Sequence, residues 1–412
     1  MKKQIKETIK SITEREERKK ILEEVVKEWI KEKMKELLEE VAREERAEYC
    51  REEGDVGNGY YERGLNTLWG KIEKLRVPRT RRGGFCPFFI ERYSRSGWLL
   101  EELVVAMYQG GCSTRDISRT LNILLEGRYT AGWISRVTEI IEEKIEGFRK
   151  REIKKWYPIV FVDGVVIKIR RVSVEGEVVY IAMGIDEEGH KEVLGFWIMG
   201  GEGESAGNWE EILEELKERG LKEVLVFVGD GLRGLGEAVK KVYPKAEFQS
   251  CILHKIRSSL RKVRKRDEEA VREELKKVYR SADKESFLKR WEGFKKRWEK
   301  IYPEVVKSWE GELHYLLTYL SYPEEIRSII YTTNPLERFI KEVKRRVKVI
   351  EFFPHPPSCA KILYLVSEEM NEKYQTRRIR DFHLAREVLR EMREERYGVG
   401  TEILVSSHTQ NS

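Results

Sequence analysis

The chain has 412 residues, of which 40% are hydrophobic and 37% are charged, with a net charge of +7. This allows two or three domains with buried cores, but no apolar run reaches the roughly 18 residues of a membrane span, and the N-terminus lacks the apolar core of a signal peptide. We therefore expect a cytoplasmic protein without membrane contact. Five scattered cysteines without a CxxC pair argue against a disulfide framework and a zinc ribbon.

Residues 1–49 consist almost entirely of helix-forming residues. An approximate helical stripe of apolar residues predicts an amphipathic helix, carried by Ile21, Val25, Trp29, Met34, Leu37, Leu38 and Val41. Two interpretations remain open, namely a helix solvated on one face and a helix that forms a coiled-coil or dimer contact.

Residues 50–98 change character, because glycines at positions 54, 57, 59, 64, 70, 83 and 84 mark turns. Four arginines surround Pro78 and aromatic residues are interleaved with them; the arginines are Arg76, Arg79, Arg81 and Arg82. Basic and aromatic residues together suit contact with nucleic acid. A small irregular domain with a solvated edge is the alternative.

Residues 98–149 predict three helices. The first ends at Gly110-Gly111, and the second opens at Ser113-Thr-Arg-Asp116, a capping-box pattern with Asp in place of Glu. The third carries apolar residues at helical spacing. This outline is that of a helix-turn-helix, which predicts DNA binding; three-helix packing without DNA is the alternative. The residues expected to face DNA are Arg115, Ser135, Arg136 and Thr138.

Residues 156–250 predict an α/β region. Three strands come first, followed by helix, strand, helix and strand, at 158–170, 178–185, 191–199, 207–219, 223–228, 232–242 and 245–249. A Rossmann unit would alternate strand and helix from the start. The order therefore predicts an RNase H-like α/β fold with a mixed five-stranded sheet, related to retroviral integrases.

Two aspartates occur where apolar strands meet an acidic turn. Asp163 follows Ile159–Val162, and Asp230 follows Val224–Gly229; each is followed by glycine, although aspartate is scarce in this chain. The fourth strand of an RNase H-like sheet pairs beside the first, so we expect the two carboxylates to be neighbours. Neither stays ionised easily beside the other without a cation. An N-cap or turn role is the alternative for either residue alone.

A metal site for phosphoryl transfer needs a third carboxylate from a later helix. Glu337 is the best candidate, because it opens a basic helix after the turn Thr332-Thr-Asn-Pro335. Cys251 and His254 are spaced to share one helix turn. No matching pair completes a zinc site, and we expect a structural or supporting role for the two residues, with a Cys–His thiol hydrolase as an alternative.

The interval 251–330 predicts a highly charged helical segment. Two basic stretches, 255–266 and 341–348, suit contact with phosphates. The residues expected to bind DNA there are Lys255, Arg257, Arg261, Lys262, Lys341, Lys344 and Arg345.

Across residues 57–370 the sequence resembles transposases of the Mutator type, in their bacterial and archaeal insertion-sequence branch. Each matching segment is short, but many occur in order: Gly59–Arg63, Val77–Arg79, Met107–Tyr108, Gly111–Arg115, Val162–Gly164, Val193–Gly195, Glu204–Ala206 with Trp209, Arg219–Leu221, Asp230–Gly231 with Gly234–Leu235, Gln249 with Cys251 and His254, and Thr332–Asn334 with Glu337. The chain departs from the family pattern at Gly229, where serine is common.

The resemblance implies a DDE triad of Asp163, Asp230 and Glu337, with a helical insertion between the last two. These residues would bind two Mg²⁺ ions, with Mn²⁺ as a substitute. The partners implied are double-stranded DNA with terminal inverted repeats, target DNA and further copies of the chain in a homodimer or larger assembly. A cytoplasmic protein of this kind associates with the nucleoid when it is bound to DNA.

We expect six segments: a helical segment at 1–49, a DNA-binding region at 50–149 with the helix-turn-helix at 98–149, a first catalytic part at 150–250, the insertion at 251–330, a last catalytic part at 331–370, and a C-terminal helix with a disordered tail at 371–412. Two alternatives to a transposase remain. One is an inactive or domesticated DNA-binding relative, and the other is an RNase H-like nuclease that cuts without joining.

Overall fold

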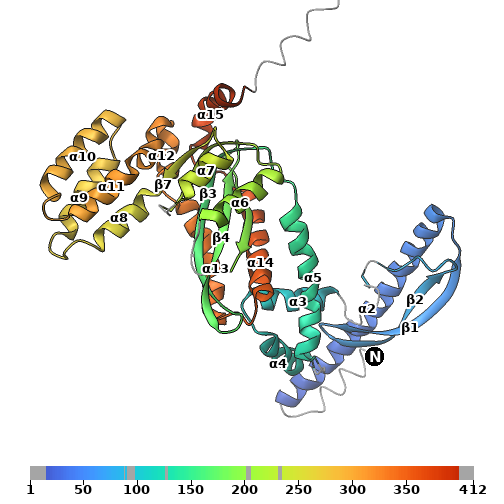
Figure 1. The fold of residues 1–412 in the computed structure, drawn as a ribbon. Coiled ribbons are helices and arrows are strands. Elements are labelled where there is room, and N and C mark those ends of the chain that lie inside the picture. Colours follow the sequence, from blue (N-terminus) through green and yellow to red (C-terminus); the bar gives the residue numbers. More distant parts are fainter. Residues whose placement is uncertain are drawn as a thin grey trace, which may run out of the picture. The chain divides into compact units, whose positions relative to one another are not determined.

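The computed structural model describes residues 15–87, 89–90, 98–125, 129–200, 206–230 and 234–398. By its internal contacts the chain divides into two compact units, Met1–Ile140 and Ile141–Ser412 (Figure 1). Several sequence-based expectations lie outside the described residues: the first 14 residues of the N-terminal helix, the motif at 204–205, Gly231 and the tail after residue 398.

In the first unit, a long helix packs against a β-hairpin. Helix α2 (Arg15–Glu53) precedes β1 (Gly57–Thr67) and β2 (Gly70–Thr80), which pair antiparallel. The hairpin was not predicted, because its glycines indicate turns; bulges between Gly57 and Tyr60 and between Arg63 and Leu65 accommodate some of them. The hairpin buries apolar side chains against the C-terminal half of the helix, in a core of Ala42, Leu65, Ile72, Leu75, Val77, Phe89 and Ile90, with Met34, Leu38 and Val41 packed against it.

The predicted apolar stripe on α2 is thus partly used within the chain. Met34, Leu38 and Val41 contact the hairpin core, whereas Trp29 and Leu37 are about half exposed. Packing of an apolar face on the hairpin stabilises the second half of the helix.

The three helices predicted for residues 98–149 are confirmed as α3 (Trp98–Gln109), α4 (Thr114–Leu125) and α5 (Ala131–Lys150). The serine cap of the expected capping box forms, because the Asp116 backbone N–H donates to Ser113 Oγ at 3.1 Å. Asp116 Oδ2 accepts from the Ser113 hydroxyl at 2.6 Å, whereas a capping box would use the Ser113 backbone N–H. The helices share a core of Leu100, Val104, Ile117, Leu121, Tyr129, Ile134 and Val137.

The second unit contains a five-stranded mixed sheet in the order β5-β4-β3-β6-β7. Its strands are β3 (Trp156–Arg170), β4 (Val174–Ile185), β5 (Lys191–Ile198), β6 (Glu223–Gly229) and β7 (Glu247–Ser250). Strands β3, β4 and β5 pair antiparallel, and β6 pairs parallel with β3 and with β7. The expected strand order, with the fourth strand beside the first, is confirmed.

Helices cover both faces of this sheet (Figure 1). Helices α6 (Ala206–Glu218) and α7 (Leu235–Val242) share a core with one face. Helices α13 (Asn334–Ile350) and α14 (Pro356–Gln375) contact β3 and β5 on the other. Successive side chains of a strand point to opposite faces, and Val162 lies in the core under α6 and α7. Asp163 therefore points towards the face that α13 covers.

The segment between β7 and α13 is helical, as predicted. It contains α8 (Ile252–Leu260), α9 (Glu268–Tyr279), α10 (Lys284–Trp298), α11 (Pro303–Leu316), the 3₁₀ turn η1 (Thr318–Ser321) and α12 (Glu324–Ile330). Trp291 stacks on Trp309 with ring centroids 5.3 Å apart, and both rings are buried. The tryptophans of this segment thus form a core of their own.

The last helix, α15 (Phe382–Tyr397), is tied to β6 through a buried carboxylate. Glu223 accepts from Arg393 Nε at 2.6 Å and from Lys155 Nζ at the same distance. Burial raises the pKa of Glu223, but hydrogen bonds from Lys155 and Arg393 outweigh it and leave the pKa below its usual value. The carboxylate therefore stabilises the fold above the unfolded-state pKa, and this contribution is lost as the pH falls through the folded-state pKa.

We accordingly expect Glu223→Gln to lower the free energy of unfolding by roughly 1–3 kcal/mol at pH 7. The difference from wild type should shrink as the pH is lowered from about 5 towards 3, because both proteins then carry a neutral side chain at this position. Thermal unfolding of both proteins over this pH range measures the effect. A difference that is constant with pH would show that the charge of Glu223 contributes nothing.

Candidate functional site

Asp163 lies inside β3, as the strand expected at 158–170 implies, and the acidic turn that was also expected at this residue does not form. Strand β3 continues to Arg170, and Asp163 pairs with Ile181 of β4. The neighbouring strand β6 is the one that ends here: Val162 pairs with Gly229, its last residue. Asp163 is therefore the first residue of β3 beyond the end of β6, and its side chain is buried, with 7% exposed.

Asp230 and Glu337 approach the same place from other elements. Asp230 directly follows Gly229, so it leaves the sheet beside Asp163. Glu337 lies in the first turn of α13, where its backbone N–H donates to Thr333 O at 2.8 Å. The negative charges of Asp230 and Glu337 both act on Asp163. The three carboxylates predicted from the sequence are thus brought together.

Two cationic side chains of α8 reach into this cluster. His254 Nδ1 lies 3.4 Å from Asp230 Oδ1, and His254 Nε2 lies 3.4 Å from Glu337 Oε1. Arg257 Nη1 donates to the same Glu337 oxygen at 2.9 Å. His254 and Arg257 are three residues apart and share one face of α8. From the sequence we predicted only a phosphate contact for Arg257. Its spacing of three residues from His254 could have indicated that it also pairs with Glu337.

The cluster perturbs the titration of its members. Burial and the negative charge of Asp230 raise the pKa of Asp163 to about 6, although His254 and the Gly164 N–H oppose the shift. The pKa of His254 is raised to about 9; the neighbouring Cys251 side chain is the first cause, and Asp230 and Asp163 add to it despite burial. A protonated His254 between the carboxylates partly compensates the repulsion between their negative charges.

The donor set suits a divalent cation in kind, because carboxylate oxygens are the ligands that Mg²⁺ prefers. Within the described ranges, however, no three His, Cys, Asp or Glu side chains lie close enough together to hold one ion. Glu337 is engaged by Arg257 and His254 in this conformation. The side chains of the site therefore fit a divalent cation in their chemistry. To bind one, Glu337 would have to give up its contacts with Arg257 and His254.

Cys251 is not placed for nucleophilic chemistry. Its side chain is buried, with 1% exposed, and its sulfur lies 3.5 Å from Thr333 Oγ1. Because Thr333 immediately precedes α13, this contact links the start of α8 to the start of the helix that carries Glu337. The geometry favours the structural role and leaves the thiol-hydrolase alternative without an accessible thiol.

Most cations of the two basic stretches are exposed, but Lys255 and Arg346 are not; Arg346 pairs with Glu342 and Glu369. Lys255 was expected to contact DNA, but it is buried with 7% of its side chain exposed and pairs with Glu312 Oε1 at 2.8 Å. Its position on the inner face of α8 determines this burial. The exposed residues are Arg257, Arg261 and Lys262 near α8, and Lys341, Lys344 and Arg345 on α13, where Arg345 also pairs with Glu342.

In the first unit the predicted arginines lie at the surface. Arg76, Arg79, Arg81 and Arg82 are exposed on and after β2, Arg115 and Arg136 are exposed on α4 and α5, and Ser135 is half-buried. Thr138 is buried instead and donates to Ser135 O at 2.8 Å, which corrects the expectation that it faces DNA. The sequence did not reveal that Arg46 and Arg76 both stack on Tyr60, at 5.1 and 4.9 Å from its ring centre, because these residues come from three different elements.

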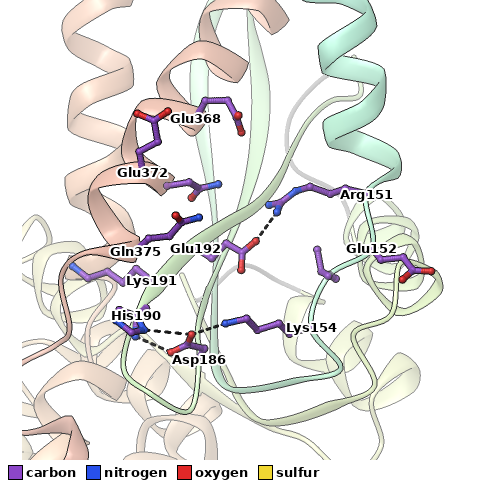
Figure 2. Close-up of a pocket in the computed structure, with 12 residues that line it drawn as sticks. Arg151, Glu152, Lys154, Asp186, His190, Lys191, Glu192, Glu368, Glu372 and Gln375 are labelled. Atoms are coloured by element: carbon purple, nitrogen blue, oxygen red, sulfur yellow. Dashed lines mark hydrogen bonds and ion pairs between the residues drawn. The ribbon is translucent and has the colours of Figure 1, made fainter. Parts of the chain in front are cut away.

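A separate cavity of about 440 Å³ is lined by residues just before β3, by residues at the turn between β4 and β5, and by α14 (Figure 2). Five of its lining side chains pair with one another: Lys154 Nζ lies 2.7 Å from Asp186 Oδ2, His190 Nδ1 lies 3.6 Å from the same oxygen, and Arg151 donates to Glu192 at 2.6 Å. These contacts give the five side chains a structural role. The carboxylate cluster around Asp163 therefore remains the candidate functional site.

The described part of the chain contains no helix that is long and apolar enough to cross a membrane. Comparison with known families matches residues 2–377 to the model described as "Transposase, Mutator family". Among individual proteins, the transposase for insertion sequence element IS1201 of Lactobacillus helveticus is 35% identical over 301 residues, which cover 73% of this chain and 81% of that protein.

Two further relatives are similar over comparable lengths. The transposase for IS905 of Lactococcus lactis is 33% identical over 324 residues, covering 79% of this chain and 82% of the relative. The transposase for IS256 in transposon Tn4001 of Staphylococcus aureus is 30% identical over 325 residues, covering 77% and 81%.

Proposed function

Because this chain belongs to the Mutator family of transposases, we propose that it cuts and joins DNA at terminal inverted repeats by metal-dependent phosphoryl transfer. The observation that carries the proposal is the convergence of Asp163, Asp230 and Glu337 from β3, the end of β6 and α13. The strand order β5-β4-β3-β6-β7 supports an RNase H-like catalytic fold interrupted by the helical insertion.

The three carboxylates would hold two Mg²⁺ ions, with Mn²⁺ as a substitute, and the bound ions would supply water activation and stabilisation of the leaving oxygen. The chain's own residues do the positioning. Arg257 and His254 keep Glu337 directed into the cluster. Glu337 would help to hold a metal ion, and the Arg257 guanidinium, whose planar fork suits a phosphate, would then be available to the DNA backbone.

DNA contacts would come from both units. The exposed arginines of the hairpin and of α4 and α5 suit recognition of the inverted repeats. The exposed cations beside α8 and on α13 suit the backbone near the scissile phosphate. Because two DNA ends must be brought together, we propose a homodimer or larger assembly, which also engages target DNA.

The test is strand cleavage of a duplex that carries the repeat found beside the gene, with Mg²⁺ present and then removed by a chelator. We expect nicking that requires the metal, followed by joining of the freed 3′-hydroxyl to a second duplex. Cleavage without joining would indicate a nuclease. Binding of the repeat without cleavage would indicate an inactive DNA-binding relative.

Glu337→Gln probes the carboxylate that the sequence pattern alone could not select. The amide keeps the size of the side chain but loses the charge that binds a metal ion, so we expect cleavage to fall by about a hundredfold or more. Initial cleavage rates at saturating DNA measure the effect. Glu325→Gln, at an exposed position of α12, is the matched control and should cleave like wild type. Wild-type rates for Glu337→Gln would place the third ligand elsewhere.

A further inference from the structure

A pocket of about 520 Å³ opens next to Asp230 and is lined mainly by α8 and α11. Arg257 and Arg261 contribute cations, and Ser308 of α11 contributes a hydroxyl. Ser250, the last residue of β7, lines the pocket beside the carboxylates, because it pairs with Gly229 immediately before Asp230. The volume lies within the range of small-ligand sites.

Ser250 carries a polar atom that the described part of the chain leaves unsatisfied. The residue is 1% exposed, and its Oγ finds no hydrogen-bond partner among the described residues. A buried hydroxyl without a partner destabilises a fold by about as much as a hydrogen bond contributes. Such a group in the wall of a pocket at a catalytic site indicates that its partner is a ligand.

The lining selects the class of ligand. Among the described lining residues the only aromatic ring is that of His254, which lies between Asp230 and Glu337, and there is no Phe, Tyr or Trp, so a nucleobase would lack the large rings that usually hold it by stacking. Lys255, Arg257 and Arg261 outnumber the carboxylates Asp230 and Glu312, and Glu312 is already neutralised by Lys255 at 2.8 Å. Hydroxyls and guanidinium groups around a net positive pocket fit a phosphate.

We propose that this pocket holds the backbone phosphate next to the scissile phosphodiester, with Ser250 Oγ donating a hydrogen bond to it and Arg261 pairing with it. This inference rests on the proposed DNA-cleaving function and adds a defined subsite to it. The pocket fixes the DNA strand at the phosphate beside the one that would be cleaved at Asp163, Asp230 and Glu337.

The first measurement compares two buried serines by thermal unfolding without DNA. Ser250→Ala removes an unpartnered hydroxyl, so the melting temperature should stay the same or rise. Ser259→Ala is the matched control: Ser259 Oγ donates to Lys255 O at 2.8 Å and accepts from Trp309 Nε1 at 2.9 Å, so this variant should melt lower. A melting temperature for Ser250→Ala as low as that of Ser259→Ala would show a structural hydroxyl and overturn the proposal.

The second measurement is the affinity for the terminal duplex in the presence of chelator, when no cleavage occurs. Loss of a hydrogen bond to a charged oxygen predicts about tenfold weaker binding for Ser250→Ala and unchanged binding for Ser259→Ala. Duplexes with a neutral methylphosphonate at one backbone position locate the contact. At one position next to the cleavage point, the substitution should weaken wild type but have little further effect on Ser250→Ala.

The outcomes separate this proposal from the proposed function. If wild type cleaves the duplex and Ser250→Ala binds and cleaves equally well, the phosphate subsite is wrong and the transposase mechanism stands. If wild type never cleaves but the methylphosphonate effect depends on Ser250, the subsite stands and the cleavage mechanism fails. Methylphosphonate effects that add fully to Ser250→Ala at every position would overturn the subsite.

Discussion

Asp163→Asn is expected to reduce DNA cleavage by at least about a thousandfold while the protein stays folded. Asparagine has nearly the same shape but cannot supply the anionic oxygen that a divalent cation requires, and metal assistance contributes several kcal/mol to such reactions. Initial rates of strand cleavage with Mg²⁺ measure the loss. Binding of the terminal duplex should persist, because the exposed cations of both units are unchanged.

The stability of the same variant gives a second, opposite expectation. Asp163 is buried beside Asp230 and Glu337, and this environment raises its pKa to about 6, so its charge opposes folding when no cation is bound. A neutral amide removes that repulsion, and the melting temperature in chelator should stay the same or rise. A residue retained for folding would show the reverse.

Asp186→Asn is the matched control, because Asp186 is another buried aspartate at the end of a strand of the same sheet. Burial raises its pKa, but Lys154 and the His190 N–H more than compensate and leave the pKa below its usual value. We expect this variant to melt lower and to retain the cleavage rate of the folded protein. If Asp163→Asn instead lost stability and kept cleaving, the assignment of the catalytic carboxylates would be wrong.

The sheet and its carboxylates could be predicted from the sequence because the signals are local. Apolar runs such as Val224–Gly229 mark buried strands, and the order of strands and helices determines that β6 lies beside β3. Asp163 and Asp230 follow from that order. Glu337 was the best candidate from its place at the start of a basic helix after the turn Thr332–Pro335. One glutamate among many is a weak local signal, however, and the family resemblance was needed to support the choice.

Features that depend on contacts between distant residues were missed. The hairpin of β1 and β2 was hidden by its glycines, and it is held by packing on α2. Lys255 was expected at the surface from the basic composition of its segment, yet the helix turns it inward to Glu312. The ion pair of Arg257 with Glu337 joins residues 80 positions apart. Sequence periodicity, which describes neighbouring residues, could not predict it.

Arg219→Met is expected to lower the free energy of unfolding by about 3 kcal/mol or more, the largest effect on stability among these variants. Arg219 is 8% exposed, and its guanidinium donates to three backbone carbonyls: Arg151 O at 3.1 Å, Leu194 O at 2.9 Å and Phe148 O at 3.4 Å. Two of these carbonyl groups lack a regular backbone hydrogen-bond donor and depend on the Arg219 guanidinium. Phe148 lies in the last turn of α5, whose carbonyls lack helical partners, and Leu194 lies at a bulge between β4 and β5.

Methionine retains the apolar stem of Arg219 and removes every hydrogen-bond donor. The decrease in the free energy of unfolding therefore measures the cost of leaving the three carbonyl groups without partners. Arg219→Lys should be nearly as unstable, because one ammonium group cannot reach three carbonyls as a planar guanidinium does. Arg380→Met, at a side chain that is 95% exposed, is the control and should change stability by less than about 0.5 kcal/mol. Chemical denaturation measures all three. Since Arg219 connects α5, β5 and the segment between α5 and β3, a stable Arg219→Met protein would mean that packing alone holds this edge of the catalytic sheet.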